Sequence, residues 1–408
     1  MNRTELAELI HNGESSGVEF KRDDVVPERL AKEMAALLNL EGGRILLGVE
    51  KDRTVSGLTR DPERAEEWVM EVARTHLRPA TIPYWETVDW GEGKVVGIVL
   101  LPADAPDKPY KAKRGSVRVT QIRVGTTTRD ATDEEEARLY QQSGRLQYGL
   151  KPVVRAEFDA LDYRRLRDYF TRVLSGDAPD DGDVTQWQQL LSNLEFMTAS
   201  TGRTVATIDG MLLFGTNTRR FVPQSGIRAL CYPGTQADYE TSADEDLKGP
   251  MVPLCGANGS IVEAGLVEQA WDFVRRNTVP TAHLDGARRI DRWDYPEPVI
   301  REAVVNALVH RDYSIAGADI LLAIYADRLE IQSPGSLPNT VTPAGMKAGM
   351  RYARNQTLVN VMRDYRYVDF RGMGVKNKII PGMLAHNGTE PDLVEQEDRF
   401  MVRLWNER

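Results

Sequence analysis

Cysteine and histidine are scarce in this chain of 408 residues. It holds two cysteines, Cys231 and Cys255, which form no Cys-x-x-Cys motif, and five histidines scattered along the sequence. The sequence therefore carries no disulfide framework and no zinc signature. This composition suits a reducing compartment, and we expect a cytoplasmic protein.

Long apolar runs and an excess of positive charge are also missing. The longest apolar strip, residues 95–101, is far too short to span a bilayer, and no apolar run follows the initiator Met. We therefore expect neither a signal peptide nor a membrane partner. The formal net charge is −9, so any contact with nucleic acid requires positive charge that is local.

Residues 298–313 predict a helix with two unlike faces. Pro298 can open a helix, because a first-turn N–H has no intrahelical partner to lose. Apolar residues recur at the helical period on one side, which suits packing against a sheet: Ile300, Ala303, Val304, Ala307 and Leu308. Glu302 and Asn306 stand one turn apart on the other side. An amide oxygen can hold Mg²⁺ and a carboxylate can deprotonate a water, although two solvated polar residues would give the same pattern.

Further motifs follow this helix in order: Ser333-Pro-Gly335, Arg354-Asn355 and Arg371-Gly372-Met373-Gly374. Glycines in such a loop let backbone N–H groups approach phosphate oxygens closely. Together with Glu302 and Asn306, the ordered set resembles a divergent bacterial branch of the GHKL ATPases.

This resemblance implies a C-terminal domain that binds ATP and Mg²⁺. It makes Glu302 the catalytic base and Asn306 a metal ligand. It implies nucleotide contacts for further residues: Gly335, Arg354, Asn355, Gly372 and Gly374. Ser333 stands where the family carries an aspartate that binds the adenine amino group, so base selectivity is open. ATP turnover, binding without turnover and a pocket retained for packing remain alternatives.

The N-terminal part of the chain contains a second ordered set of motifs: Glu14…Glu19-Phe20-Lys21, Leu38-Asn39…Gly42-Gly43, Leu47-Gly48-Val49-Glu50, Val55-x-Gly57 and residues 122–131. This set resembles the Schlafen/AlbA-type domain, over roughly the first 140 residues. It implies that the N-terminal domain engages nucleic acid, RNA or DNA.

A basic stripe lies between residues 108 and 129, with no acidic residue in it. Its cations are candidate phosphate contacts: Lys108, Lys111, Lys113, Arg114, Arg118, Arg123 and Arg129. Tyr110 is a candidate for stacking on a base. Valines alternate with Arg118 and Arg123, so we expect these arginines on one face of a strand and salt-dependent binding. A solvated hairpin that balances the acidic remainder is the alternative.

The same resemblance raises the hypothesis that the N-terminal domain is a nuclease, with RNA expected over DNA as its substrate. It makes Glu14 and Glu19 metal ligands and catalytic residues for Mg²⁺ or Mn²⁺, with Lys21 stabilising charge. The third acid maps onto Glu50 or Asp52. The alternative is that these carboxylates only tie a strand to neighbouring basic residues.

The whole sequence predicts an α+β protein with three domains. Residues 1–145 would form the Schlafen/AlbA-like domain, residues 146–290 an α/β connector, and residues 291–408 a GHKL-type (Bergerat) α/β sandwich. We expect a homo-oligomer that acts on nucleic acid under nucleotide control. A DNA-binding transcriptional regulator without cleavage and a nucleotide-sensing oligomeric scaffold are the other hypotheses.

Overall fold

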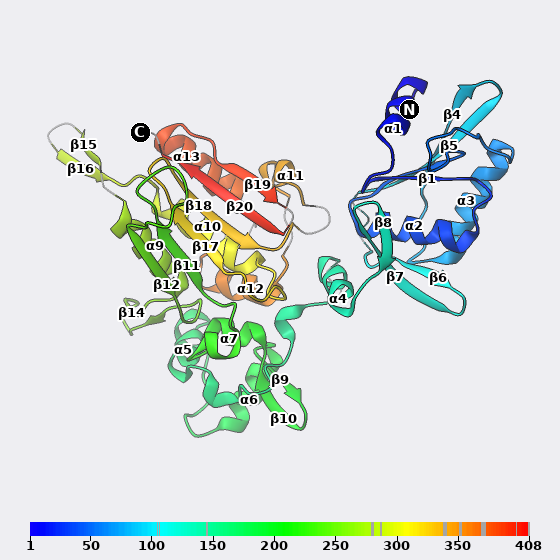
Figure 1. Cartoon of the computed structure of the whole chain (residues 1–408). Coiled ribbons are helices and arrows are strands. Elements are labelled where there is room, and N and C mark those ends of the chain that lie inside the picture. The colour runs from blue at the N-terminus through cyan, green and yellow to red at the C-terminus, as the bar shows by residue number, and fades with distance from the viewer. Residues whose placement is uncertain are drawn as a thin grey trace. The chain divides into compact units, whose positions relative to one another are not determined.

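The computed structural model describes all residues except 104, 106, 144–145, 279–280, 286–287, 338–340, 351–352, 369–372, 397 and 407–408. For residues 134, 142, 281–285 and 288–292 it describes the backbone alone. The chain forms two compact units, Met1–Leu146 (unit 1) and Gln147–Arg408 (unit 2). Helices and strands are mixed in both units, which confirms the α+β class (Figure 1).

Unit 1 consists of four helices and eight strands among its described residues. Their bounds are α1 Arg3–Asn12, β1 Val18–Lys21, α2 Pro27–Asn39, β2 Gly43–Leu47, α3 Pro62–His76, β3 Leu77–Arg78, β4 Tyr84–Gly91, β5 Lys94–Leu101, β6 Lys111–Arg114, β7 Val117–Val124, β8 Thr127–Asp130 and α4 Asp133–Gln142. One sheet has the strand order β1-β2-β5-β4, with β1 parallel to β2, and the other has the order β3-β6-β7-β8.

Helix α2 joins the two sheets of unit 1. Its apolar side packs on β2 and β5 of the first sheet and on β6 of the second, and Leu30, Met34 and Leu37 are fully buried there. Pro27 opens the helix at its first turn, as the fixed φ of proline allows. On the opposite face of the first sheet, Leu6 and Ile10 of α1 cover Phe20. The first sheet is therefore enclosed on both faces.

Unit 2 starts with short elements and ends with a large sheet and its helices. The bounds are η1 Tyr148–Leu150, η2 Phe158–Ala160, α5 Tyr163–Asp168, η3 Tyr169–Val173, α6 Val184–Asn193, β9 Met197–Ser200, β10 Arg203–Ala206, α7 Ile208–Phe214, α8 Thr218–Phe221, β11 Ile227–Cys231, β12 Ala243–Leu247, β13 Leu254–Cys255, β14 Ile261–Glu263, α9 Leu266–Asn277, β15 Thr281–Asp285, β16 Arg288–Arg292, α10 Glu297–His310, β17 Ile320–Ile324, β18 Arg328–Pro334, α11 Pro343–Ala348, α12 Gln356–Asp364, η4 Val375–Ile379, α13 Ile380–Asn387, β19 Asp392–Gln396 and β20 Arg399–Trp405.

The six-stranded sheet of unit 2 crosses the expected boundary at residue 290. Its order is β12-β11-β17-β18-β20-β19, with β11 parallel to β17 and the other neighbours antiparallel. Strands β11 and β12 belong to the expected connector, and the other four belong to the expected GHKL-type domain. Because β11 hydrogen-bonds directly to β17, the two segments share one sheet and one core. Residue 290 therefore does not separate two compact units.

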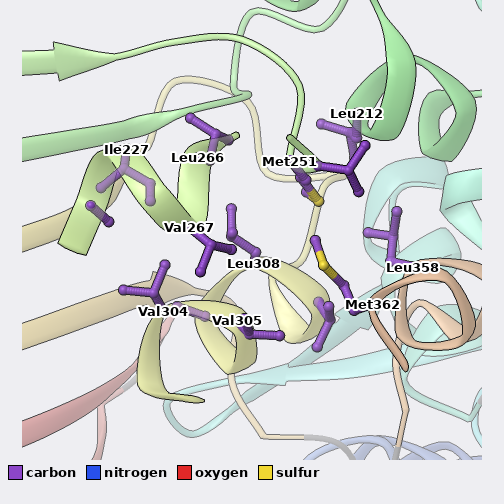
Figure 2. Close-up of a cluster of buried hydrophobic side chains, with 14 of the residues drawn as sticks. Leu212, Ile227, Met251, Leu266, Val267, Val304, Val305, Leu308, Leu358 and Met362 are labelled. Atoms are coloured by element: carbon purple, nitrogen blue, oxygen red, sulfur yellow. The ribbon is translucent and has the colours of Figure 1, made fainter. Parts of the chain in front are cut away.

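Helix α10 is buried on more sides than its sequence pattern suggests. It packs on β18 of the sheet, and Figure 2 shows its apolar residues among side chains from α7, α9 and α12. The valines outside the expected apolar face are also buried: Val299, Val305 and Val309. A central helix covered by other helices needs apolar residues on these sides as well. Among the described residues, no helix is both long and apolar enough to cross a bilayer.

Candidate functional site

A cavity of about 560 Å³ lies in unit 2 between α10, β18, η4 and the segment that holds α11 and α12. Its polar lining comprises Glu302, Asn306, His310, Ser333, Ser336, Gln356 and Arg363. Its apolar lining includes Ile331, Val341, Met346, Met350, Phe400 and Val402. The size and the mixture of an apolar wall with a few polar groups are typical of a small-molecule site.

Glu302 and Asn306 both line this cavity, as their spacing on one helix predicts. The Glu302 side chain is 2% exposed, and Lys378 Nζ lies 3.0 Å from its Oε2. Asn306 Nδ2 donates to Glu302 Oε1 at 3.4 Å, so the amide oxygen of Asn306 is the atom available to a hard cation. No cluster of three His, Cys, Asp or Glu residues suited to a metal occurs in the described part of the chain. A cation here would need further oxygen ligands from its nucleotide and from water.

Gly374 stands directly against the Glu302 carboxyl group. A Cβ atom at this position would lie 1.6 Å from Glu302 Oε1 and 2.4 Å from its Cδ. Only glycine therefore permits this close approach between the loop and α10. Gly374 is followed without a break by η4 and α13, so it stands at a helix N-terminus. Gly372 lies outside the described residues.

Ser333, near the end of β18, and Gly335, just beyond that strand, both line the cavity. Ser333 Oγ donates to the carbonyl oxygen of Ala307 at 2.9 Å, which ties the strand to α10. Gly335 has φ +108°, in the region that favours glycine, and a Cβ there would lie 2.4 Å from Arg354 Nη1. The glycine is therefore required by both conformation and space.

Arg354 and Asn355 do not line the cavity, contrary to their expected role in nucleotide contact. Both are buried, and both donate to carbonyl groups at the end of α10. Arg354 Nη1 reaches the carbonyl of His310 at 3.2 Å, and Asn355 Nδ2 reaches those of Val309 and Arg311 at 2.9 Å each. The last carbonyls of a helix have no intrahelical partner, so these two side chains cap α10.

His310 lines the cavity at the end of α10. Burial, together with the nearby Arg354 guanidinium, lowers the pKa of His310 to about 4. The imidazole is therefore neutral near pH 7. Asp312, which follows it, accepts hydrogen bonds from the backbone N–H and the hydroxyl of Ser314 at 2.9 and 2.6 Å. The Asp312 carboxylate therefore stabilises a turn beyond the helix.

In unit 1, Glu19 belongs to a network of ion pairs. Arg123 Nη2 lies 2.8 Å from Glu19 Oε2, and Lys21 Nζ pairs with the other carboxylate oxygen. Glu33 of α2 adds a second acid, 3.4 Å from Lys21 Nζ and 3.5 Å from Arg123 Nη1. Both cations are thus shared between two carboxylates. The arrangement corresponds to the alternative in which the glutamates tie a strand to basic residues.

The other acids of the expected nuclease site, namely the metal ligand Glu14 and the candidate third acids Glu50 and Asp52, make separate contacts. Glu14 Oε1 accepts a hydrogen bond from the backbone N–H of Phe20 at 3.1 Å. Glu50 lies 4.0 Å from Arg22 Nη1. Asp52 is exposed and accepts from the backbone N–H of Thr54 at 2.9 Å, which lowers the pKa of its carboxyl. Each of the four acids therefore has partners of its own within unit 1: Glu14, Glu19, Glu50 and Asp52.

Two residues of the basic stripe are buried and cannot contact phosphate. Lys108 is 6% exposed, donates to the carbonyl of Leu40 at the end of α2, and has its pKa lowered to about 8 by burial. Arg123 lies on the inner face of β7, because it is five residues from the exposed Arg118 and side chains alternate along a strand. Tyr110 is also buried, so the expected stacking on a base is wrong.

The other cations of the stripe are exposed or partly exposed, and several are paired. Lys111 pairs with Glu136, Arg114 lies 2.9 Å from Asp130, and Arg129 lies 2.8 Å from Glu135. Lys113 and Arg118 stand opposite each other across β6 and β7. Lys113, Arg114 and Arg118 are all exposed around the turn at Gly115, and we call these three residues the basic tip.

Comparison with known families supports both resemblances. Residues 14–132 match the family model described as "Schlafen, AlbA_2", and residues 317–404 match the one described as "Putative ATP-dependent DNA helicase recG C-terminal". The chain thus combines an AlbA-type domain with a C-terminal ATPase-like domain. The second match begins after α10, so Glu302 and Asn306 lie outside it. No curated protein matches the sequence.

Several solved structures are similar to the chain, two of them as follows. The DIP2311 protein from Corynebacterium diphtheriae is 19% identical over 96% of this chain and 76% of that chain, with a TM-score of 0.46. The N-terminal domain of a "Putative ATP-dependent DNA Helicase RecG-related Protein" from Nitrosomonas europaea is 21% identical over 32% of this chain and 94% of that chain, with a TM-score of 0.26. Both scores are below 0.5, so neither likeness bears on function.

Sequence reasoning missed two cations of the cavity region. Lys378 pairs with Glu302, and Arg363 lines the cavity from the end of α12. Lys376 and Lys378 follow Gly374 at once in the sequence, which was a usable signal for positive charge beside a glycine loop. Arg363 had no comparable signal, because only the fold brings α12 to this wall.

Proposed function

We propose that the cavity of unit 2 binds ATP together with Mg²⁺. The observation that carries this proposal is the convergence of Glu302, Asn306, Gly335 and Gly374 on one cavity, from segments up to 72 residues apart (374 − 302). An acid and an amide oxygen face a glycine at a helix N-terminus, where backbone N–H groups favour phosphate oxygens. The match of residues 317–404 to an ATP-dependent family supports the same ligand.

Each group has a distinct task in this proposal. Asn306 supplies a neutral oxygen ligand to Mg²⁺, and phosphate oxygens and water complete the shell. Gly374 keeps the loop backbone close enough for its N–H groups to reach phosphate. Glu302 accepts a proton from the attacking water if ATP is hydrolysed. The Ser333 hydroxyl already donates to Ala307, so towards a base it can act only as an acceptor.

Calorimetric titration with ATP, in the presence and absence of Mg²⁺, tests the proposal. Asn306→Ala should abolish the Mg²⁺-dependent part of the affinity, because it removes the amide oxygen. Asn193→Ala, an exposed substitution at the end of α6, is the matched control and should bind like the parent protein. Unchanged Mg²⁺-dependent binding by Asn306→Ala would contradict the assigned pocket.

A second function, nucleic-acid binding by unit 1, is favoured by the basic tip. A hairpin turn that exposes Lys113, Arg114 and Arg118 can place cations against successive phosphates, although the whole chain is acidic. The match of residues 14–132 to the AlbA-type family supports this role. The test is fluorescence anisotropy with labelled RNA and duplex DNA over a range of salt concentrations. Binding that does not weaken with salt would argue against the basic tip.

Cleavage of nucleic acid has less support from the site than binding. Glu19 would first have to leave Arg123 and Lys21 before it could hold Mg²⁺ or Mn²⁺. We therefore propose that unit 1 binds without cutting, as in the regulator hypothesis. Incubation of labelled RNA and DNA with each metal tests this point, and metal-dependent cleavage that Glu19→Ala abolishes would establish the nuclease instead.

Assembly and control by nucleotide complete the proposal. We propose a homo-oligomer whose arrangement changes when ATP binds, because a ligand shifts an equilibrium by its differential affinity for two states. Light scattering after size exclusion, with and without ATP and Mg²⁺, measures this response. A response to ATP combined with no affinity for any nucleic acid would favour the nucleotide-sensing scaffold.

A further inference from the structure

Lys378 forms an ion pair with Glu302, the buried acid of the cavity. Its ammonium group lies 3.0 Å from Glu302 Oε2, and the Glu302 side chain is 2% exposed, whereas that of Lys378 is 37% exposed. The acid is therefore fixed inside the protein and the cation approaches it from the solvent side. Lys378 also stands four residues after Gly374, on the short helix η4 that opens beside the carboxyl group.

While this ion pair persists, the Glu302 carboxylate is poorly suited to accept a proton from the attacking water. A carboxylate held by an ammonium ion is a poorer base and a poorer partner for a metal-bound water. The remaining oxygen, Oε1, accepts from Asn306 Nδ2 and touches Gly374. Both oxygens of the carboxylate are thus engaged by neighbouring groups of this cavity.

We propose that Lys378 acts as a gate on Glu302: its ammonium group blocks the carboxylate until the terminal phosphate of ATP attracts the ammonium away. This gate rests on the ATP-binding function proposed above. The ammonium of Lys378 has two alternative partners: the Glu302 carboxylate when no nucleotide is bound, and the terminal phosphate of ATP when it is. Transfer of the ammonium to phosphate removes this cation from the Glu302 carboxylate, so that Glu302 becomes a better base for water only in the loaded site. Lys378 is therefore a positioning residue, since it acts through Glu302.

The geometry supports this exchange at little cost to the fold. The partly exposed side chain of Lys378 is long and flexible, so its ammonium can move a few ångströms without a change in the backbone. A phosphate group carries more negative charge than one carboxylate and competes for the same cation. Asn306 and Gly374, the proposed phosphate-side residues, line the cavity together with Glu302, and Lys378 reaches this wall through its ion pair with Glu302.

The test compares the affinities for ATP and ADP, each with Mg²⁺, measured by calorimetry on the full chain. Lys378→Ala should lower the preference for ATP over ADP by at least about tenfold, which corresponds to one charge-assisted hydrogen bond. Lys378→Arg should retain most of the preference, because it keeps the charge. Glu302→Gln should bind ATP more tightly than the parent chain, because the ammonium no longer has to leave a carboxylate.

A lysine outside the cavity provides the matched control. Lys248 forms one ion pair with Asp246 at 3.0 Å, and Lys248→Ala should leave the ratio of the two affinities unchanged. If Lys378→Ala weakens ATP and ADP equally, or if Glu302→Gln binds ATP more weakly, the gate is wrong although the ATP site stands. If the parent chain binds neither nucleotide, both the site and the gate are wrong.

Discussion

Arg123 of β7 and Glu19 of β1 form an ion pair of 2.8 Å in which the arginine side chain is fully buried. The same guanidinium donates to the carbonyl oxygens of Ser15 and Val18 at 2.6 and 3.2 Å. It therefore binds the second sheet of unit 1 to the first strand of the chain. The basic stripe suggested Arg123 as a phosphate contact, but this arginine instead links two sheets of unit 1.

Arg123→Ala should destabilise unit 1 by about 3–5 kcal/mol, because it leaves the Glu19 carboxylate buried with one cation fewer. Urea denaturation measures the loss. Arg118→Ala, an exposed residue of the same strand, is the control and should change the free energy of unfolding by no more than about 0.5 kcal/mol. Equal effects of the two substitutions would contradict the role of Arg123.

The basic tip should control the dependence of nucleic-acid binding on salt. Replacing both Lys113 and Arg118 with alanine removes the two cations that face each other across the hairpin. The slope of log affinity against log salt concentration should fall by about one for each phosphate that the protein no longer neutralises. Lys51→Ala, an exposed lysine elsewhere in unit 1, should keep the original slope. A slope that is the same in all three proteins would mean that nucleic acid binds elsewhere.

Gly374→Ala should weaken nucleotide binding by at least about tenfold, since the new methyl group would overlap the Glu302 carboxyl and displace the loop. Calorimetry with ATP and Mg²⁺ measures this loss, and circular dichroism checks the fold. Gly182→Ala provides the control, because a Cβ at Gly182 meets no atom within 4 Å. Parent-like affinity in Gly374→Ala would show that the loop and Glu302 do not act together.

Lys108 should make stability depend on pH in the alkaline range. Burial lowers the pKa of its folded state from 10.5 to about 8. Below pH 8 the folded protein bears the full cost of a buried charge. Between pH 8 and 10.5 the folded state loses this proton before the unfolded state does, so stability should rise with pH, by up to about 3 kcal/mol.

The comparison of the parent chain with Lys108→Met isolates this contribution. The difference in the free energy of unfolding between the two proteins, from urea denaturation at pH 7.5 and about pH 10, should shift in favour of the parent chain as pH rises. Lys113→Met, at an exposed lysine, should show no such shift. A difference that does not vary with pH would mean that Lys108 is charged throughout in the folded protein.

Sequence reasoning succeeded where a single local pattern sets the outcome. One helical turn places Glu302 and Asn306 together, and the glycines at 335 and 374 indicate close approach of backbone to other groups. Both features survive in the folded chain because each depends on a few neighbouring residues. The cavity that unites them depends on the whole of unit 2, and only the resemblance to a known family anticipated it.

Several errors arose where a polar or charged side chain has a partner that is distant in sequence. Lys108, Arg354 and Asn355 all donate to the carbonyl groups that end a helix elsewhere in the chain. A run of cations looks the same in sequence whether its members face water or a helix end. The prediction that Arg118 and Arg123 share one face of a strand was wrong for a simpler reason. The two residues are five positions apart, and an odd separation places side chains on opposite faces of a strand.

The parallel pairing of β11 with β17 decides how the protein can be dissected. A fragment that starts at residue 291 would leave β17 with the backbone N–H and C=O groups of one edge unpaired, next to apolar side chains that β11 and α9 normally cover. Such a fragment should aggregate when expressed alone. The shortest piece able to keep the cavity in a dispersed, folded form therefore begins near residue 147.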